Sequence, residues 1–473
     1  MSLTGIEHLT PSPSKGQLFQ GNYITNFDFT NQFLPDVYEK QAEIYGNRSI
    51  GGFLKLVSAE MPSASDEIRW VEQGRLHVAY DNVAIGNNNV FTVTLAANPD
   101  GTAHAASAAA AIRVGQTIMV QGINSSGVGI TPVLRGVVTV AGAAASGDTT
   151  TFTAPCLEAA DWTGITGVSG YTKSKILVYG SEFAKGTDGM AGSLDASYSS
   201  YTNKPMILKD NYQINGSDTA QIGWIEVTSE NGASGYLWYL QSEHETRQRF
   251  EDYLEMSMIE AVKSTQSASP AGGTEGLFAA LTGRGNVYTD LSGDLATNMT
   301  GFDNILKQLD KNGAIEENML YIDKTLSLAI DDALAAKNSY GTGGTSYGVF
   351  NNSEEMALNL GFSGFRRGGY DFYKTDWKYL NDFGTRGQFN DVEGVIIPAG
   401  TSTVYDQELG QNIKRPFLHV RYRASETDDR KMKTWITGSV GGSYTTTTDE
   451  MRVSFLSERC LIVQGANNFV LLK

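Results

Sequence analysis

The longest stretch of helical periodicity, from Ser234 to Val262, constrains the fold more than any other feature of the chain. Its apolar residues recur at helical spacing, at Phe250, Leu254, Met258 and then Ala261 or Val262. Gly232 and Ser234 mark its start, and a Ser/Gly-rich run over 264–273 ends it. At 1.5 Å per residue such a helix extends about 40 Å, so the sequence predicts a beam longer than one small core requires.

The same stretch contains His244 and Glu245, which begin a His-Glu-x-x-His zinc motif. A zinc site of this kind needs a second histidine four residues later, so that both imidazoles lie on one helical face. Gln248 occupies that position. The five histidines of the chain are all well separated: His8, His77, His104, His244 and His419. We therefore expect no metal site and a solvated or hydrogen-bonded His244.

Composition indicates a large protein without a disulfide framework. With 473 residues, 41% of them hydrophobic, the chain exceeds what one core holds, and about two to four domains are expected. No apolar run reaches the length of a membrane span, and the first residues lack the apolar segment of a secretion signal. Cys156 and Cys460 lie far apart, in what we predict to be different domains.

The charge balance limits the partners. The chain carries 52 acidic and 36 basic residues, a net charge of −16, which argues against broad binding of nucleic-acid phosphates. Local basic faces remain compatible with such contacts. Its 52 glycines, 22 tyrosines and 20 phenylalanines are typical of loop-rich and strand-rich assembly proteins, and also of β-rich enzymes.

Residues 81–180 differ sharply in composition from their surroundings. Their charged residues are few, well below the 19% of the whole chain: Asp81, Asp100, Arg113, Arg135, Asp148, Glu158, Asp161, Lys173 and Lys175. Short apolar runs alternate with Gly, Asn, Ser and Ala turns at the spacing of a small sandwich or barrel. We predict an inserted all-β domain.

The segments that flank this insertion indicate a two-stranded excursion. Residues 67–80 predict a strand with Leu76, Val78 and Tyr80 on one face and Arg75 and His77 on the other. The same charge-rich strand texture resumes after the insertion, in "KILVYGSEFAKGTDG" and "KPMILKDNYQI".

An α/β section follows the long helix. Thr300 is placed to cap a helix that ends at Gly313 and buries Phe302, Ile305, Leu306 and Leu309. Asn318 to Ile322 predicts a buried strand, and a further helix face is marked by Leu326, Ile330 and Leu334. At the C-terminus, "MRVSF" and "CLIVQ" predict two strands, and "FVLLK" predicts a third, docked one. At the other end, residues 1–30 predict an extended arm, and a short helix follows over Pro35 to Tyr45.

Motifs for catalysis are incomplete. Gly344 to Gly348 matches the G-x-S-x-G nucleophile elbow around Ser346, but loop-like sequence stands where the elbow needs a strand. There is no Gly-Lys-Ser/Thr phosphate loop, and Gly341, Gly343 and Gly344 do not complete a dinucleotide motif. We expect no catalytic residues and no cofactor.

Two basic and aromatic stretches are candidates for binding. "FRRGGYDFYKTDWKYLNDF" combines Arg366, Arg367 and Tyr370 with Phe372, Tyr373 and Trp377. Such a mixture suits a protein interface or a single-strand binder, and the acidic chain favours the protein interface. In "FLHVRYR", alternation puts His419, Arg421 and Arg423 on one strand face. That face suits an acidic neighbour, packaged DNA or plain solvation.

The order of these segments, together with "EIRWVEQGRLHVAY", "VYGSEFAKGTDG" and "SERCLIVQGANNFVLLK", resembles the major capsid proteins of tailed bacteriophages with the Hong Kong 97 (Johnson) fold, in particular the crAss-like branch. The resemblance implies an α+β fold. It implies an N-terminal arm over 1–48, an E-loop over 49–80 and 181–230, and the inserted β-rich domain over 81–180 between them. It further implies a P domain over 231–337 and 425–473, with a spine helix from Ser234 to Thr265, and an A domain over 338–424.

The resemblance also implies a virion protein, made in the cytoplasm of a bacterial host, that assembles with itself into hexamers, pentamers and a closed shell. Implied partners are a portal, auxiliary or head-fibre proteins, and packaged double-stranded DNA contacted without sequence specificity, with no membrane. The candidate subunit-interface residues are Trp70, Arg75, Glu182, Lys185, Arg366, Arg367, Tyr370, Trp377, Arg421 and Arg423. The alternative is another virion component, in the tail or a fibre, with a β-rich binding module.

Overall fold

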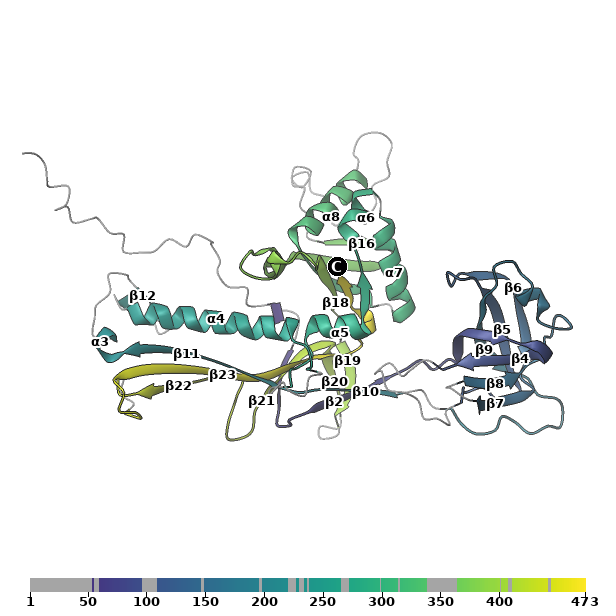
Figure 1. Ribbon diagram of the computed structural model, residues 1–473, viewed down its shortest axis with the longest axis horizontal. Helices are drawn as coiled ribbons and strands as arrows, with labels where there is room; N and C mark the ends of the chain where they lie inside the picture. The colour runs from purple at the N-terminus through teal and green to yellow at the C-terminus, as the bar shows by residue number, and fades with distance from the viewer. Residues whose placement is uncertain are drawn as a thin grey trace, which may run out of the picture.

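The computed structural model describes residues 53–54, 59–95, 109–145, 149–194, 198–219, 227–228, 234–235, 238–264, 272–297, 299–313, 315–337, 364–399, 401–406, 411–440 and 444–473. It contains both helices and strands, so the predicted α+β class is confirmed. An elongated body occupies one side of Figure 1, and a separate strand-rich unit stands at the end of a thin ribbon on the other side. The predicted N-terminal arm and the helix over Pro35 to Tyr45 lie outside the described residues.

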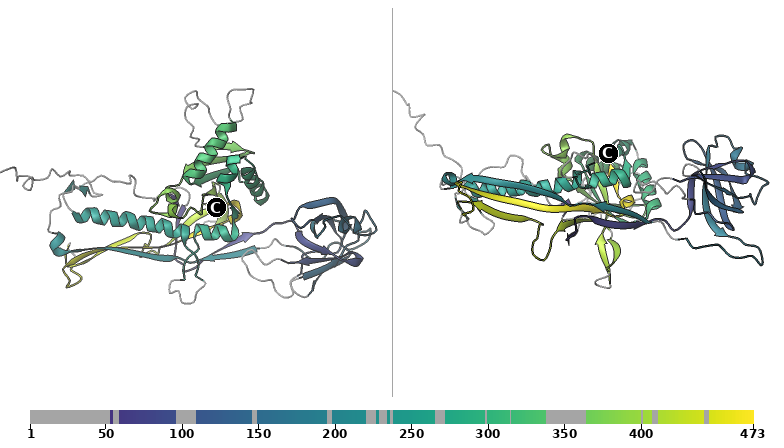
Figure 2. Two further views of the ribbon diagram at one scale, coloured as in Figure 1. Left: turned by 45° about the horizontal axis from the view of Figure 1, so that its top comes forward. Right: turned by 60° about the horizontal axis from the view of Figure 1, so that its bottom comes forward.

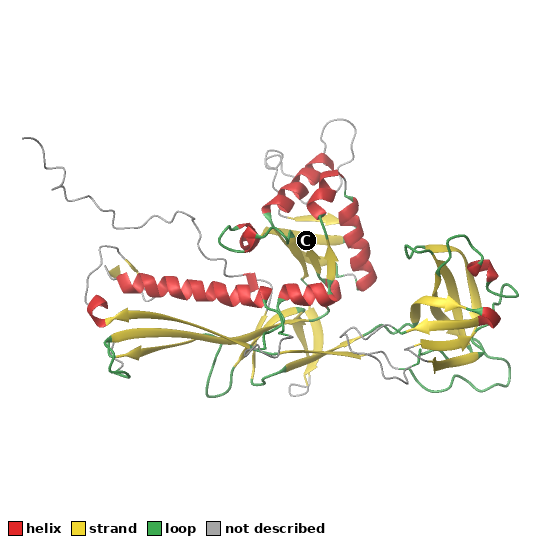
Figure 3. Cartoon of the chain, viewed as in Figure 1, coloured by secondary structure: helices red, strands yellow, loops and turns green. Residues whose placement is uncertain are grey.

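The predicted beam is α4, Trp238–Glu260, a helix of 23 residues that extends about 35 Å. It lies along a five-stranded sheet (Figure 3), and its buried side chains Phe250 and Leu254 pack on Met451, Val453 and Phe455 of that sheet. The predicted apolar face of this helix is therefore confirmed, since Phe250, Leu254 and Met258 are at most 3% exposed. The helix is shorter than predicted at both ends. Before it, Ser234–Gly235 forms strand β13, which pairs with β12 (Val227–Thr228). After its last residue, the Ala261 carbonyl accepts a hydrogen bond from the Gly276 N–H instead of continuing the helix.

The sheet beneath α4 has the order β1-β21-β23-β11, and β22 also pairs with β23. Its strands are β1 (Ala59–Ser63), β21 (Leu418–Arg423), β23 (Glu450–Val463), β11 (Met206–Asn215) and β22 (Lys433–Gly438). The sequence predicted two strands where β23 runs unbroken for 14 residues. Because it pairs with β11 and β22 along one half and with β21 along the other, β23 joins chain segments that are far apart in sequence.

A second sheet of six strands, with helices α6 (Leu291–Thr297), α7 (Thr300–Asn312) and α8 (Lys324–Lys337) packed against it, forms the head of the body (Figure 1). Its order is β14-β24-β18-β15-β17-β16. The strands are β14 (Asn286–Tyr288), β24 (Val470–Leu472), β18 (Gly394–Pro398), β15 (Glu317–Ile322), β17 (Tyr370–Asp376) and β16 (Gly364–Arg367). β15, before residue 338, pairs with both β17 and β18, after it, so this sheet spans the residue at which the A domain was predicted to begin.

The helix faces of this head follow the predicted periodicity. Phe302, Ile305, Leu306 and Leu309 of α7 are buried, as are Leu326 and Ile330 of α8, and Leu334 packs against the same cluster. Thr300 is not the cap, because Met299 holds that position without a side-chain hydrogen bond. The apolar C-terminus is docked as β24, after a left-handed turn at Gly465 with φ +59°. Within the described part of the chain, no helix is both long and apolar enough to cross a bilayer.

The ribbon is an antiparallel pair of β2 (Ile68–Gln73) and β10 (Tyr198–Asn203). The prediction of one strand over 67–80 is wrong, because the chain leaves the ladder at Gly74 and re-enters strand at Ala79. Leu76 in the intervening turn is 73% exposed and has no shared face with Tyr80.

The ribbon carries residues 79–181, here called the 79–181 unit, which stand apart from the body in the views of Figures 1 and 2. Its sheet has the order β6-β5-β9-β3-β4-β8-β7. The strands are β3 (Ala79–Ile85), β4 (Val90–Thr94), β5 (Gln116–Ile123), β6 (Gly129–Val137), β7 (Val140–Ala145), β8 (Thr149–Thr153) and β9 (Lys173–Ser181), with one short helix, α2 (Thr163–Thr166).

The 79–181 unit encloses a core of its own. Phe91 stacks on Phe152 with ring centres 5.0 Å apart and meets Trp162 edge-on at 5.2 Å. The Trp162 indole donates to the carbonyl of Ala154 at 2.8 Å, so its one polar group is satisfied inside the core. Ala79 pairs with Leu177, which brings the two ends of the unit together at the ribbon. Strands that bury this much apolar surface leave few positions for charge, which accounts for the composition of the segment.

Candidate subunit interface

The root of the ribbon is fixed to the body by Arg284, the last residue of α5 (Leu277–Arg284). Its guanidinium carbon lies 4.4 Å from the ring centre of Tyr201 on β10 and 5.6 Å from that of Trp70 on β2. The same group pairs with Glu275 at 3.0 Å and lies 3.7 Å from Glu72. A cation held between two aromatic rings and two carboxylates sets the direction in which the ribbon leaves the body.

A buried asparagine completes this root. Asn203, which is fully buried, donates to the carbonyl oxygens of Glu275 and Leu461 at 3.0 and 2.7 Å. Its side-chain oxygen accepts hydrogen bonds from Thr274 Oγ1 and from the Glu275 backbone N–H. Because every polar atom of the amide is bonded, the site tolerates this residue type and few others. No local pattern marks Arg284 or Asn203 as part of a site, since most of their partners lie far away along the chain.

Trp70 belongs to this root. It is 7% exposed, packs with Cys460 and Ile462, and donates its indole N–H to Glu72 at 3.0 Å. Beyond the root, the ribbon exposes Val71 at 57% and Tyr198 at 65%. The apolar surface that the ribbon offers to another molecule is therefore that of Val71 and Tyr198 rather than that of Trp70.

Arg75, in the turn that follows β2, contacts its own chain. Its guanidinium donates to the carbonyl of Lys311 at 2.9 Å, at the C-terminal end of α7. A cation at that end of a helix meets unsatisfied carbonyls and the negative end of the helix dipole. This contact holds the turn against the head of the body.

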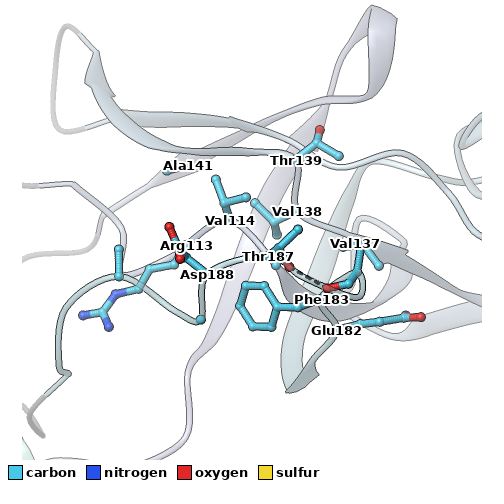
Figure 4. Close-up of a pocket in the computed structure, with 14 residues that line it drawn as sticks. Arg113, Val114, Val137, Val138, Thr139, Ala141, Glu182, Phe183, Thr187 and Asp188 are labelled. Atoms are coloured by element: carbon cyan, nitrogen blue, oxygen red, sulfur yellow. Dashed lines mark hydrogen bonds between the residues drawn. The ribbon is translucent and has the colours of Figure 1, made fainter.

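Glu182 and Lys185 lie in the segment that leads back from the 79–181 unit. Glu182 lines a cavity of about 530 Å³ between this segment and the unit, whereas Lys185 is exposed outside it. Figure 4 shows Val114, Val138 and Phe183 around the cavity, and the Phe183 ring covers Gly115 so closely that a Cβ there would clash with it. The Glu182 backbone N–H donates to the Gly115 carbonyl at 2.8 Å, which fixes the return segment to the unit.

The stretch around Arg366 is divided between core and surface. Arg367 makes a two-bond pair with Asp303 of α7 at 2.6 and 2.9 Å, and this guanidinium holds the pKa of the Asp303 carboxyl below its usual range. Arg366 lies 3.5 Å from Asp371 and is largely exposed. Tyr370 and Trp377 are 6% and 4% exposed, which corrects the expectation that they present their rings to a neighbour.

Trp377 packs inside the main core of the body. Its ring stacks on Phe53 at 4.3 Å and meets Phe278 at 6.1 Å. Tyr373 is 50% exposed, and two rings of the following loop are exposed further, Phe383 at 82% and Phe389 at 71%. Phe383 is the last residue of the predicted binding stretch and Phe389 lies beyond it, and neither stood out as a candidate, because local pattern does not distinguish a buried ring from an exposed one here.

The basic face predicted for β21 is only partly formed, because one of its three residues is buried. His419 is buried at 2% exposed, so it does not belong to a solvated stripe. Arg421 donates to the carbonyl of Pro62 at 3.3 Å, and Arg423 pairs with Asp66 and lies 3.8 Å from Glu458. These cations meet carbonyls and carboxylates of their own chain, which reduces what they offer to an acidic partner.

No group of three or more His, Cys, Asp or Glu residues within the described ranges is arranged to hold a metal ion. His244 on α4 stands without such companions. The Ser346 motif lies outside the described residues.

Comparisons with known proteins give distant similarities. No protein-family model matches the chain, and no curated protein matches it. Among solved structures, a chain of Microbacterium phage Oxtober96 is 8% identical with a TM-score of 0.41, over 95% of this chain and 99% of that one. A capsid chain of a native GTA particle is 8% identical with a TM-score of 0.41, over 96% and 98%. A capsid chain of cyanophage P-SCSP1u is 13% identical with a TM-score of 0.33, over 63% and 80%.

Proposed function

We propose that this chain is the major capsid protein of a tailed bacteriophage of the crAss-like branch, with a Hong Kong 97-type fold. Made in the cytoplasm of a bacterial host, copies of it assemble as hexamers and pentamers into an icosahedral head shell around double-stranded DNA. The shell also meets a portal and auxiliary or head-fibre proteins. The chain performs no catalysis and uses no metal or cofactor.

The observation that carries this proposal is the elongated build of the body and its ribbon. α4 and the long strands β11 and β23 form a stiff slab, and the ribbon reaches beyond it with the 79–181 unit at its end (Figure 2). A two-stranded ribbon is marginally stable alone in water. A neighbouring copy that covers Val71 and Tyr198 would stabilise it, and many such modest contacts sum in a closed lattice.

The charge of the chain supports a container for DNA rather than a protein that grips it. At −16, a lining of this protein repels phosphates on average, which keeps the genome free to enter and leave. The cations of β21 face oxygens of their own chain, as described above, so they add little to a DNA-binding surface.

Negative-stain microscopy of the purified, recombinantly expressed chain tests the proposal. Rings of five or six copies, or closed shells, are expected. Trimers or tubes would favour a tail or fibre component instead. A strictly monomeric chain under all assembly conditions would contradict the proposal.

A further inference from the structure

The loop from Asp382 to Asp391, here called the 382–391 loop, exposes two aromatic rings on a rigid base. Phe383 and Phe389 are 82% and 71% exposed. Such rings bury on the order of 150–250 Å² each when covered, and large aromatic residues are frequent at the centre of protein interfaces. Their exposure in one copy suggests that another surface covers them.

Several bonds hold the loop in this shape. Thr385 donates its hydroxyl to the carbonyl of Tyr379 at 2.7 Å, and Asp382 accepts the Gly384 N–H at 2.8 Å. Gly387 packs so closely that a Cβ there would lie 2.7 Å from the Asp382 carbonyl. A loop already ordered in the free chain loses little entropy on binding, which suits a docking element.

Arg386 fastens the loop to the end of α4. Its guanidinium pairs with Glu260, the last residue of α4, and makes two bonds to Asp391 at 2.9 and 2.8 Å. Tyr379 also donates to Glu260, at 2.7 Å. A force on the two rings is therefore passed directly to the long helix. That connection is useful when the partner is another load-bearing copy.

The charge around the rings excludes nucleic acid as the partner. Arg386 is the one guanidinium beside the three carboxylates of Glu260, Asp382 and Asp391, so this group carries a net charge of about −2, and Asp391 is 54% exposed. The loop therefore requires an apolar surface with a positive rim.

One face of the sheet in the 79–181 unit combines apolar side chains with a positive rim. Here the β9 face is defined by the exposed side chains of Lys173, Lys175, Leu177 and Tyr179 of β9, together with Met119 of β5, which pairs with Leu177, and Arg135 of β6, which pairs with Met119. Directly paired residues point to the same side of a sheet. Leu177 and Tyr179 are 41% and 48% exposed, whereas their neighbours Ile118, Val120 and Ile176 point into the core.

The balance of charge on the β9 face is the opposite of that on the loop. Lys173, Lys175 and Arg135 supply three cations, and the adjacent carboxylates are Asp81, 3.9 Å from Lys175, and Glu158, 2.7 Å from Arg135. The net charge of this group is about +1. The unit stands away from its own body at the end of the ribbon (Figure 1), and the exposure of Leu177 and Tyr179 leaves the β9 face accessible to another molecule.

We propose that the 382–391 loop of one copy docks on the β9 face of a second copy, with Phe383 and Phe389 packed against Leu177 and Tyr179. The contact joins two different surfaces of one chain, so it is a head-to-tail contact and builds rings or lattices rather than isolated pairs. It rests on the proposed function, because it presupposes assembly of copies.

A double-mutant cycle on the full chain tests the coupling. Phe383→Ser with Phe389→Ser forms one variant, Leu177→Ser with Tyr179→Ser forms the second, and a third carries all four changes. Each pair should raise the concentration needed for assembly by about tenfold or more. The combined variant should be little worse than either pair, because both pairs remove the same contact. Thermal unfolding of each unassembled variant should match the parent, since the changed side chains are exposed.

Cross-linking tests the contact directly. In a Cys156→Ser background, Phe383→Cys with Leu177→Cys should give disulfide-linked multimers on oxidation of assembled protein. The matched control is Phe383→Cys with Tyr444→Cys, because Tyr444 is 85% exposed but lies outside both surfaces. Equal cross-linking in the control, additive losses in the cycle, or undiminished assembly of the variants would overturn this contact and leave the proposed function standing. A parent chain that never assembles would overturn both.

Discussion

Phe250 of α4 stacks on Phe455 of β23 with their ring centres 5.9 Å apart. Both rings are at most 2% exposed, and around them pack Ile214 and Val453. This contact attaches the long helix to the sheet beneath it. The stiffness of the slab depends on such contacts because α4 has polar residues over much of its surface.

Phe250→Ala is expected to lower the free energy of unfolding by about 3–5 kcal/mol, because it leaves a cavity between helix and sheet. Urea unfolding, followed by the circular dichroism of the helices, measures this change. Tyr253→Ala is the matched control on the same helix, since Tyr253 is 44% exposed, and it should cost less than about 1 kcal/mol. Equal losses in the two variants would show that α4 does not rest on the sheet through this face.

Arg284→Ala is expected to loosen the ribbon root, because Trp70 and Tyr201 lose the cation between them and Glu72 and Glu275 lose their partner. Backbone amides of β2 and β10 should then exchange with deuterium about ten times faster or more, while those of β15 stay unchanged. Arg69→Ala serves as the control, because Arg69 is on the same ribbon with its side chain 67% exposed. Unchanged protection in Arg284→Ala would refute the clamp.

The two cysteines should differ in reactivity. Cys460 is fully buried in β23, and burial raises the pKa of its thiol to about 12, so it carries almost no thiolate at neutral pH. Cys156 is partly exposed. A thiol reagent applied to the native chain at pH 8 should therefore modify Cys156 alone, and both residues in urea, as mass spectrometry of peptides would reveal. Modification of Cys460 in the native chain would contradict its placement.

The pair of Arg367 and Asp303 should make stability depend on acid. Asp303 has a folded-state pKa below its unfolded value, near 3.9, so its contribution is complete above about pH 5 and is lost as the pH falls through the folded-state pKa. The urea midpoint of the parent should exceed that of Asp303→Asn at pH 7, and the gap should close below about pH 4. The exposed carboxylate of Asp332, changed to Asn, provides the control. A gap that widened in acid would reverse the assigned direction.

The elements that the sequence predicted well are those whose signal is local. The faces of α4, α7 and α8 follow from apolar spacing alone, since each helix buries the stripe that its own residues define. The strand around Leu320 and the docked tail at Val470 were found for the same reason. The observed ends of these elements differ from the predicted ends by a few residues. Helix ends depend on hydrogen bonds to other segments, such as the bond from the Gly276 N–H to the Ala261 carbonyl.

The predictions that failed depend on pairing across the chain. The sheet of the head crosses residue 338, where the sequence predicted the start of the A domain, because β15 pairs with β17 and β18 beyond that residue, which no local pattern encodes. Tyr370 and Trp377 have the composition of an interface, but they fill the cores of the head and of the body. His419 alternates with apolar residues as a solvated residue would, yet the sheet buries both faces of β21 at that point.

The most direct test of the central claim, that copies of this chain build a shell, is the mass distribution of the purified chain in solution over a range of concentration and salt. We expect a 51.1 kDa monomer in equilibrium with species of five and six copies and with much larger particles. Added salt should promote growth by screening the repulsion between copies charged at −16 each. A single 51.1 kDa species at every concentration and salt would contradict the account.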